Sequence, residues 1–120
     1  MNEQRINDRS LVRHLLMAAC FEGHAGRFDG VISNLSAGGC FVLSTGRVIS
    51  GEALEGKVLI PTGRWVKIKG EVIYTNKGKG FGLCFVGLSD SERALVDLVM
   101  DYAKQDERDD RHFTQEKSEL

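Results

Sequence analysis

Arginines recur at four-residue intervals near the N-terminus. Arg9 and Arg13 form an R-x-x-x-R pair, and Arg5 makes an overlapping pair with Arg9. In extended chain, residues four apart project to the same side and lie about 13 Å from each other. A guanidinium donates two parallel hydrogen bonds to a phosphate or to the O6/N7 edge of guanine, and its face stacks on a base. Such a pair is suited to gripping opposite parts of one flat, doubly charged molecule.

A second polar motif follows in the segment Asn-Leu-Ser-Ala-Gly-Gly, residues 34–39. Asn34 and Ser36 offer short polar side chains separated by one residue, so we expect them on the same side of the chain. Gly38 and Gly39 permit positive φ and close backbone approach. The same residues also fit a plain turn, and the segment by itself predicts only a polar corner between two strands.

The sequence offers no catalytic constellation. Cys20 and His24 are four residues apart, but a strand and its turn would not place them face to face as nucleophile and base. Zinc needs about four convergent ligands, and the cysteines and histidines form no C-x-x-C or H-x-x-x-H. No glycine-rich loop ends in Gly-Lys-Ser/Thr. We therefore expect no enzyme activity, no metal site and no cofactor.

Short apolar runs separated by glycine turns occupy the middle of the chain. Fourteen glycines and one proline favour short segments joined by tight turns. Residues 65–74 alternate apolar with charged side chains for most of their length, as a half-buried strand does. The other predicted strands are residues 15–22, 27–33, 40–43, 57–60 and 81–86. The pattern predicts a mainly β fold, a six-stranded antiparallel β-barrel, because closing the sheet removes exposed edges.

The pattern changes period near Ser89, where Ser89 and Glu92 fit an S-x-x-E capping box. Apolar residues then follow at helical spacing, namely Leu95, Leu98, Val99 and Tyr102. We expect one C-terminal amphipathic helix that covers an open end of the barrel. From residue 106 the chain is polar without an apolar period, which predicts a frayed or disordered tail over 106–120.

Length and composition indicate one domain, with 120 residues, 42% hydrophobic and 28% charged. The net charge of −1 argues against a protein that holds long nucleic acid by bulk electrostatics. No apolar run approaches the roughly 20 residues of a membrane-spanning helix, and the polar N-terminus lacks a secretory h-region, so we expect a cytoplasmic protein. Three widely spaced cysteines favour reduced thiols.

The two polar motifs are more informative together than either is alone. Arg9-x-x-x-Arg13 followed by Asn34-x-Ser36-x-x-Gly39, in a six-stranded barrel with a closing helix, resembles the PilZ-domain family of bacterial cyclic di-GMP receptors. The resemblance covers roughly residues 9–102. The stretch 80–85 before the capped helix is also similar to that family's last strand.

The resemblance implies an N-terminal arm, residues 1–14, that is flexible and wraps over the barrel domain of residues 15–105. Arg9 and Arg13 would bind the phosphates and the guanine Hoogsteen edges and stack on the bases. Asn34 and Ser36 would meet a guanine edge or a phosphate from the barrel side.

Other parts of the implied site are less sharply defined. Gly39, together with Gly38, would hold the turn and let the backbone approach the ligand. Arg5-x-x-x-Arg9 fits the motif as well as the later pair does. We favour Arg9 and Arg13, because an apolar strand begins just after them, and Arg5 then contributes from outside. Many family members have Asp where this chain has Asn34, and a carboxylate accepts from guanine N1–H and N2–H together.

The resemblance predicts a receptor and adaptor that binds cyclic di-GMP, changes the conformation of its arm and signals to a protein partner. A PilZ-like adaptor that binds no nucleotide is the main alternative. A nucleic-acid-binding barrel is a further alternative, with a basic patch of Lys67, Lys69, Lys77 and Lys79. The sequence leaves open the ligand stoichiometry, the oligomeric state and the pathway.

Overall fold

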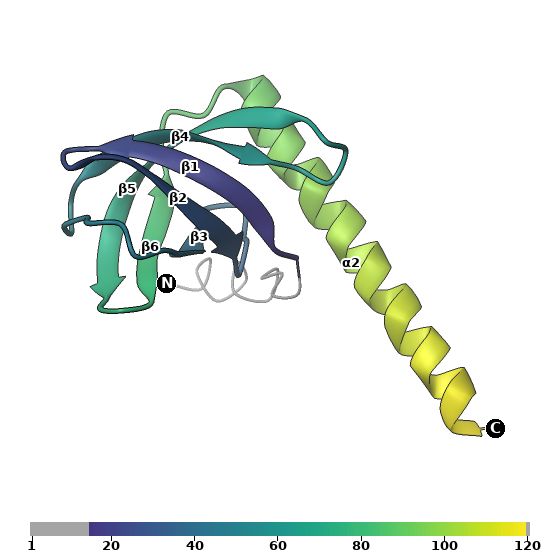
Figure 1. Ribbon diagram of the computed structural model, residues 1–120. Coiled ribbons are helices and arrows are strands. Elements are labelled where there is room, and N and C mark those ends of the chain that lie inside the picture. Colours follow the sequence, from purple (N-terminus) through teal and green to yellow (C-terminus); the bar gives the residue numbers. More distant parts are fainter. Residues whose placement is uncertain (1–14, 120) are drawn as a thin grey trace, which may run out of the picture.

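The computed structural model describes residues 15–119, with side chains for residues 15–104. Within these residues, six strands form a closed antiparallel barrel that a helix follows (Figure 1). The elements are β1 (Met17–Gly23), β2 (Gly26–Ser33), β3 (Gly39–Leu43), β4 (Ala53–Leu59), β5 (Trp65–Asn76), β6 (Gly80–Phe85) and α2 (Asp90–Glu119). Around the barrel the strand order is β1-β2-β3-β6-β5-β4. The predicted mainly β architecture with a closing helix is confirmed.

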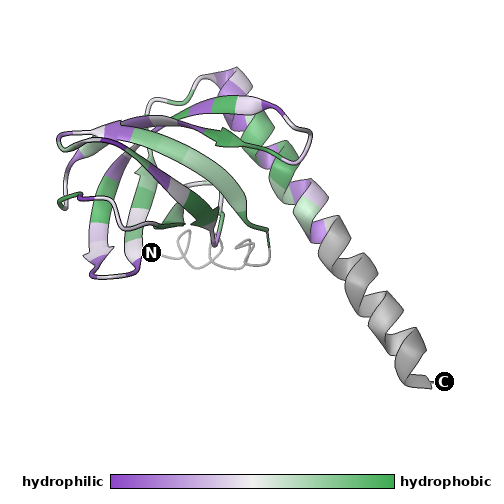
Figure 2. Cartoon of the chain, in the orientation of Figure 1, coloured by the Kyte–Doolittle hydropathy of each residue, from purple (hydrophilic) through white to green (hydrophobic). Residues whose placement is uncertain are grey.

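Hydrophobic and hydrophilic residues alternate along the strands, which gives each strand a buried face and an exposed face (Figure 2). On β5, Val66, Ile68 and Val72 are buried while the residues between them are mostly exposed, as the pattern predicted. β4 begins at Ala53, four residues before the predicted start at residue 57. The first half of β4 contains Glu55 and Gly56, and only every second residue points inward. A search for a continuous apolar run therefore misses this part of the strand.

Aromatic rings fill one part of the barrel interior. The ring centroid of Phe21 lies 5.6 Å from that of Phe28 and 6.2 Å from that of Phe81. Phe28 and Phe81 meet edge to face at 6.0 Å. These three rings join the neighbouring strands β1 and β2 to β6, which is distant in sequence. Edge-to-face and offset contacts of this kind add to the burial energy of each ring.

The capping box begins α2 as predicted. The backbone N–H of Ser89 donates to Glu92 Oε1 at 2.9 Å, and the backbone N–H of Glu92 donates to Ser89 Oγ at 3.1 Å. These reciprocal bonds satisfy two amide groups that have no partner inside the helix.

Two of the four apolar residues predicted for the helix, Leu95 and Val99, pack on the barrel, but the other two do not. Val99, Met100 and Ala103 are buried, whereas Leu98 is 61% exposed and Tyr102 is 57% exposed. The expectation that Leu98 and Tyr102 belong to the core is wrong. At 100° per residue, these two side chains lie at the margin of the buried stripe, and only the packing angle of the helix decides on which side of that margin they fall.

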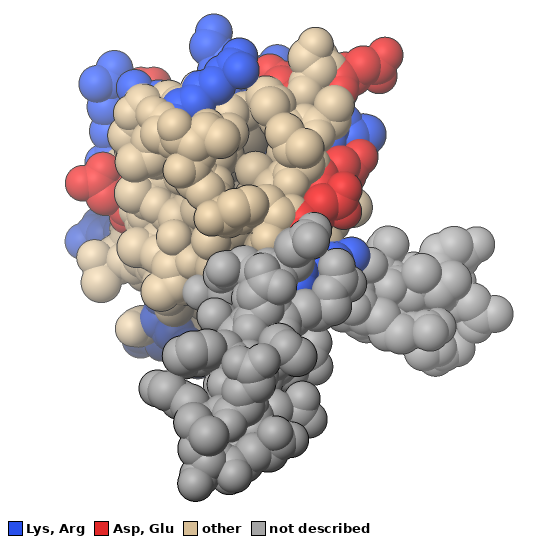
Figure 3. Space-filling view, turned by 90° about the vertical axis from the view of Figure 1, so that its right-hand side faces the viewer, with Lys and Arg blue, Asp and Glu red and all other residues tan. Residues whose placement is uncertain are grey.

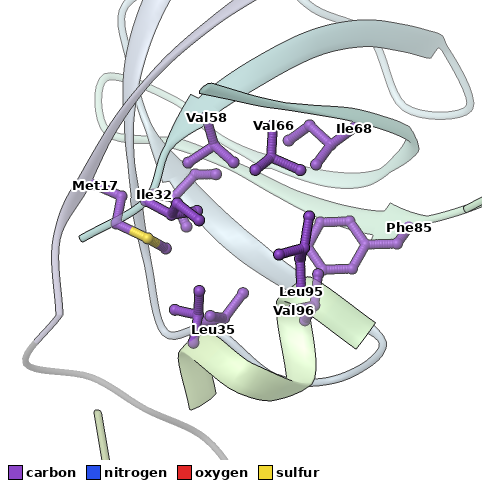
Figure 4. A pocket seen from close by; sticks show the side chains of 11 residues that line it. Met17, Ile32, Leu35, Val58, Val66, Ile68, Phe85, Leu95 and Val96 are labelled. Carbon is purple, nitrogen blue, oxygen red and sulfur yellow. The ribbon is translucent and has the colours of Figure 1, made fainter. Parts of the chain in front are cut away.

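The helix closes one end of the barrel. Leu95 and Val96 project from α2 toward Leu35, Ile32 and Phe85 on the barrel side (Figure 4). The apolar cavity left between them measures only about 20 Å³, which is about the space of one water probe. The barrel end under α2 therefore has no room for a ligand the size of a nucleotide.

Helix α2 continues to Glu119, where we predicted a disordered tail over residues 106–120. The backbone of residues 106–119 is helical. Residues 88–120 contain neither glycine nor proline, the two residue types most unfavourable in a helix interior. An apolar period indicates that one face of a helix is buried, so its absence does not exclude a helix. Among the described residues, no helix combines the length and apolar character needed to cross a bilayer.

Candidate ligand-binding site

The polar corner of residues 34–38 joins β2 to β3. Asn34 has a φ of 48° and is the residue at which the chain leaves β2 in the left-handed region. Asparagine enters this region more readily than other residues that carry a side chain. Gly38 and Gly39 permit positive φ, but neither glycine adopts it. Asn34 is therefore the residue of this corner whose backbone adopts the left-handed conformation.

Leu35 anchors the corner to the core. Its side chain is 3% exposed and faces the small apolar cavity beneath α2 (Figure 4). Its neighbours Asn34 and Ser36 are half-buried. Because the residue between them is held inside, both polar residues have a defined position at the barrel surface.

Ser36 closes the corner with two hydrogen bonds to one acceptor. Its backbone N–H and its hydroxyl both donate to the carbonyl oxygen of Gly39, at 2.8 Å and 3.2 Å. The single hydroxyl hydrogen is thus used inside the turn, while the hydroxyl oxygen keeps its capacity to accept. In this arrangement Ser36 can accept from a ligand N–H or from a guanidinium, whereas donation to a phosphate would require the hydroxyl to rotate away from Gly39.

The two glycines of the motif have different roles. A Cβ at Gly39 would overlap the carbonyl oxygen of Leu83 on β6, whereas a Cβ at Gly38 would meet nothing within 4 Å. Gly38 instead accepts a hydrogen bond from the backbone N–H of Phe85 at 2.9 Å. The close approach at Gly39 therefore brings β3 against β6, and the glycine is explained by strand packing without any ligand.

An aromatic pair lies across β6, on the outside of the barrel. Phe41, two residues after Gly39 on β3, and Tyr74 on β5 both lie opposite Gly82 of β6. Their ring centroids are 6.2 Å apart and their planes differ by 29°. Tyr74 is 51% exposed, so part of its ring is open to solvent. Sequence reasoning missed this pair, although the alternating glycines of residues 80–82 signalled a strand surface on which neighbouring rings can lie.

The arginines of the R-x-x-x-R motif lie outside the described residues, as does the whole predicted arm of residues 1–14. The meeting of Arg9 and Arg13, with Arg5 as an outer contributor, at the polar corner stays a prediction. The structure describes the barrel side of the candidate site.

The described residues contain no group of three or more His, Cys, Asp or Glu side chains that could hold a metal ion. Cys20, Cys40 and Cys84 are free thiols. Burial raises the pKa of the Cys40 thiol to about 12, so this thiol stays protonated at neutral pH and cannot act as a nucleophile.

The family assignment follows from a match that spans most of the chain, because the model of the PilZ domain matches residues 3–101. The chain belongs to the PilZ domain family. This PilZ domain finds no match among curated protein sequences.

Solved structures with the same fold include other PilZ domains. The PilZ domain of CeSA from a cellulose-synthesizing bacterium is 14% identical with a TM-score of 0.58, and the match covers 75% of this chain and 94% of that one. The inhibitor of motility MotI/DgrA of Bacillus subtilis is 16% identical with a TM-score of 0.63, over 82% of this chain. This PilZ domain spans only 50% of the length of the motility inhibitor. At these identities the likeness shows the fold.

Proposed function

We propose that this PilZ domain is a cytoplasmic cyclic di-GMP receptor and adaptor, which binds the dinucleotide between its N-terminal arm and the polar corner and signals to a protein partner. PilZ domains are generally cyclic di-GMP receptors and not enzymes, and we propose neither catalysis nor a metal or cofactor here. The observation that carries the proposal is the pairing of Arg9-x-x-x-Arg13 with a corner that presents Asn34 and Ser36 at the barrel surface.

The arginines supply the charge in this proposal. Cyclic di-GMP carries two phosphate charges, and the hydroxyl hydrogen of Ser36 is already donated to Gly39. Phosphate recognition therefore falls to Arg9 and Arg13, each charged hydrogen bond contributing about 1.5 to 3 kcal/mol. Ser36 then accepts from a guanine N–H or from one of these guanidiniums.

Asn34 and the aromatic pair supply base recognition. The left-handed backbone of Asn34 holds its amide at the corner, where its single acceptor oxygen receives one guanine N–H. The exposed part of Tyr74, whose ring stacks on that of Phe41, offers a flat surface on the outside of the barrel for stacking of a purine.

Calorimetric titration with cyclic di-GMP tests the proposal. We expect binding at micromolar affinity or tighter for the native chain, and loss of at least about tenfold for Arg9→Ala, Arg13→Ala and Ser36→Ala. Arg64→Ala is the matched control, since Arg64 is an exposed arginine in the turn between β4 and β5. Arg5→Ala distinguishes the two registers, because it abolishes binding only if Arg5 and Arg9 are the working pair.

In the proposed response, the arm becomes ordered when it contacts the ligand. The conformational entropy that the arm loses offsets part of the contact energy. Amide hydrogen exchange measured with and without cyclic di-GMP reports it. We expect slower exchange over residues 5–14 when ligand is added, and unchanged exchange in the Arg13→Ala variant. Equal exchange in the presence and absence of bound ligand would contradict the conformational part of the proposal.

Two other functions make different predictions. A PilZ-like adaptor that binds no nucleotide gives flat titrations for the native chain and all variants. A nucleic-acid-binding barrel gives an oligonucleotide affinity that falls steeply with salt. Its candidate lysines form two separate groups, with Lys67 and Lys69 on β5 and Lys77 and Lys79 at the turn before β6, which disfavours one continuous basic surface.

A further inference from the structure

The polar corner presents no carboxylate to a base. A guanine carries N1–H and N2–H side by side, and a carboxylate accepts both together, whereas the amide of Asn34 has one acceptor oxygen. The middle of the barrel surface beside α2 has no charged side chain, and Lys, Arg, Asp and Glu lie toward its edges (Figure 3). In the other direction, beyond the corner, the barrel continues through β3, β6 and β5.

Three residues form one row across these strands. Gly39 of β3 pairs with Cys84 of β6, and Cys84 pairs on its other side with Glu71 of β5. Neighbouring strands are about 4.8 Å apart, so Glu71 lies roughly 10 Å from Gly39 along the barrel wall. The row begins at the polar corner, because Ser36 donates two hydrogen bonds to the carbonyl oxygen of Gly39.

Cys84 and Glu71 face the outside of the barrel. Leu83 and Phe85, the neighbours of Cys84, are buried in the core. Val72, the neighbour of Glu71, is buried as well. Successive side chains of a strand point to opposite faces, and accordingly Cys84 is half-buried and Glu71 is exposed. One small side chain therefore separates the start of β3 from a carboxylate on the outer surface.

The ring of Tyr74 lies in the adjacent row on the same side. Tyr74 pairs with Gly82, two residues before Cys84, and a Cβ at Gly82 would meet the Tyr74 ring. Tyr74 and Glu71 are three residues apart, and the bulge between Val72 and Tyr74 puts both on one face. Alternate residues of β6 are about 7 Å apart. A purine stacked on the ring therefore has an edge near the carboxylate.

The Glu71 carboxylate is available as an acceptor. Among residues 15–104, it forms no ion pair. The residues directly opposite it are Ala53 on β4 and Cys84 on β6, neither of which carries a cation. Lys69, two residues earlier on β5, lies opposite Glu55. Both oxygens of Glu71 can therefore accept from a ligand.

We propose that Glu71 recognises one guanine of cyclic di-GMP, an inference that rests on the proposed function of this site. The two carboxylate oxygens accept the N1–H and N2–H of that base, while its face stacks on Tyr74. Arg9 and Arg13 hold the phosphates, so the carboxylate meets a base edge. Glu71 thus supplies the paired acceptor that Asn34 lacks, and it makes the site selective for guanine.

Calorimetric titration of the native chain and Glu71→Gln tests this inference. We expect Glu71→Gln to weaken cyclic di-GMP binding about tenfold or more. The matched control is Glu55→Gln, an exposed glutamate on β4, which keeps the native affinity. If Glu71 acted only through its charge, its removal would strengthen binding of the anionic ligand. Unchanged or tighter binding by Glu71→Gln therefore overturns the inference.

A second ligand tests the selectivity. Cyclic di-IMP keeps the N1–H of each base and lacks the 2-amino group. We expect the native chain to prefer cyclic di-GMP at least about tenfold, and Glu71→Gln to reduce this preference at least about threefold. An equal preference in the native chain and the variant means that Glu71 does not contact the base, which overturns the inference.

The Cys84 thiol reports whether the ligand covers this row. We expect saturating cyclic di-GMP to slow alkylation of Cys84 by iodoacetamide at least about threefold, as measured by mass spectrometry. Cys20, a half-buried thiol on β1, is the internal control. Alkylation of Cys84 that is not slowed at saturation overturns this inference and leaves the proposed receptor function intact. A native chain that binds no cyclic di-GMP overturns both.

Discussion

The carboxylate of Glu52 contacts two atoms of His24, although the two residues are 28 positions apart. One carboxylate oxygen, Oε2, accepts the backbone N–H of His24 at 2.7 Å, and the other, Oε1, lies 2.8 Å from His24 Nδ1. Oε1 also accepts the backbone N–H of Ile49 at 3.0 Å. The side chain of Glu52 is only 6% exposed. This carboxylate ties the β1–β2 turn to the loop between β3 and β4.

Replacing Glu52 by glutamine should destabilise the fold in a pH-dependent way. Burial raises the pKa of Glu52, but the hydrogen bonds from His24 and Ile49 outweigh it and leave the pKa below its ordinary value of 4.5. A carboxyl whose pKa is lower in the folded state contributes stability above its unfolded pKa and loses that contribution as the pH falls through the folded value. We expect Glu52→Gln to cost about 1 to 3 kcal/mol near pH 7.

Urea unfolding of the native chain and Glu52→Gln from pH 7 down to pH 3 measures this effect. The difference in unfolding free energy should shrink as the pH falls below 4.5. Glu55→Gln is the control, since Glu55 is exposed on β4, and its effect should stay small throughout. A difference for Glu52→Gln that does not vary with pH would show that the charge of this carboxylate is not what stabilises the loop.

Gly39 and Gly38 should respond differently to the same substitution. Gly39→Ala places a Cβ against the carbonyl oxygen of Leu83, and neither backbone can move without breaking the β3–β6 ladder. We expect a loss of at least about 2 kcal/mol in unfolding free energy, as overpacking produces. Gly38→Ala meets nothing and should change the stability by less than about 0.5 kcal/mol.

Urea denaturation of both glycine variants checks this difference. It also guards against a misinterpretation, because a Gly39→Ala protein that fails to bind ligand has lost strand packing and gives no evidence of a direct contact at that glycine. Equal stabilities for the two variants would mean that β3 and β6 can separate at Gly39 at little cost.

Asn34 needs a substitution that removes its side chain without straining its backbone. At a φ of 48°, Asn34→Gly keeps the conformation, whereas Asn34→Ala should cost about 1 kcal/mol. If the amide accepts a guanine N–H, Asn34→Gly weakens cyclic di-GMP binding at unchanged stability, and Asn34→Asp keeps or strengthens it. Thermal unfolding together with calorimetric titration separates the two effects. A large loss of affinity in Asn34→Asp would show that the side chain donates to the ligand instead.

The exposed ring of Tyr74 should contribute to nucleotide affinity if bases stack on this face. Tyr74→Leu keeps apolar cover over Gly82 and removes the aromatic surface, so we expect weaker binding by about tenfold from the loss of stacking. Ile73→Leu is the control, since Ile73 is a neighbouring exposed residue outside the pair. Titration with cyclic di-GMP gives the answer, and unchanged affinity in Tyr74→Leu would place the bases elsewhere.

Local sequence determined the elements of this fold and the motifs that name its family. Alternation over β5, the glycine turns and the Ser89–Glu92 capping box each depend on residues close in the chain, so they could be predicted without the structure. Helix propensity beyond residue 105 was also present locally, but the apolar period measures burial and missed it.

Tertiary structure alone decided the contacts between distant residues. Three such contacts join strands and loops that lie far apart in the sequence. They are the packing of Gly39 against Leu83, the stacking of Phe41 on Tyr74 and the binding of His24 by Glu52. The exposure of Leu98 likewise depends on the angle at which α2 meets the barrel. Periodicity tells which side chains share a face, and only the assembled barrel determines what each face meets.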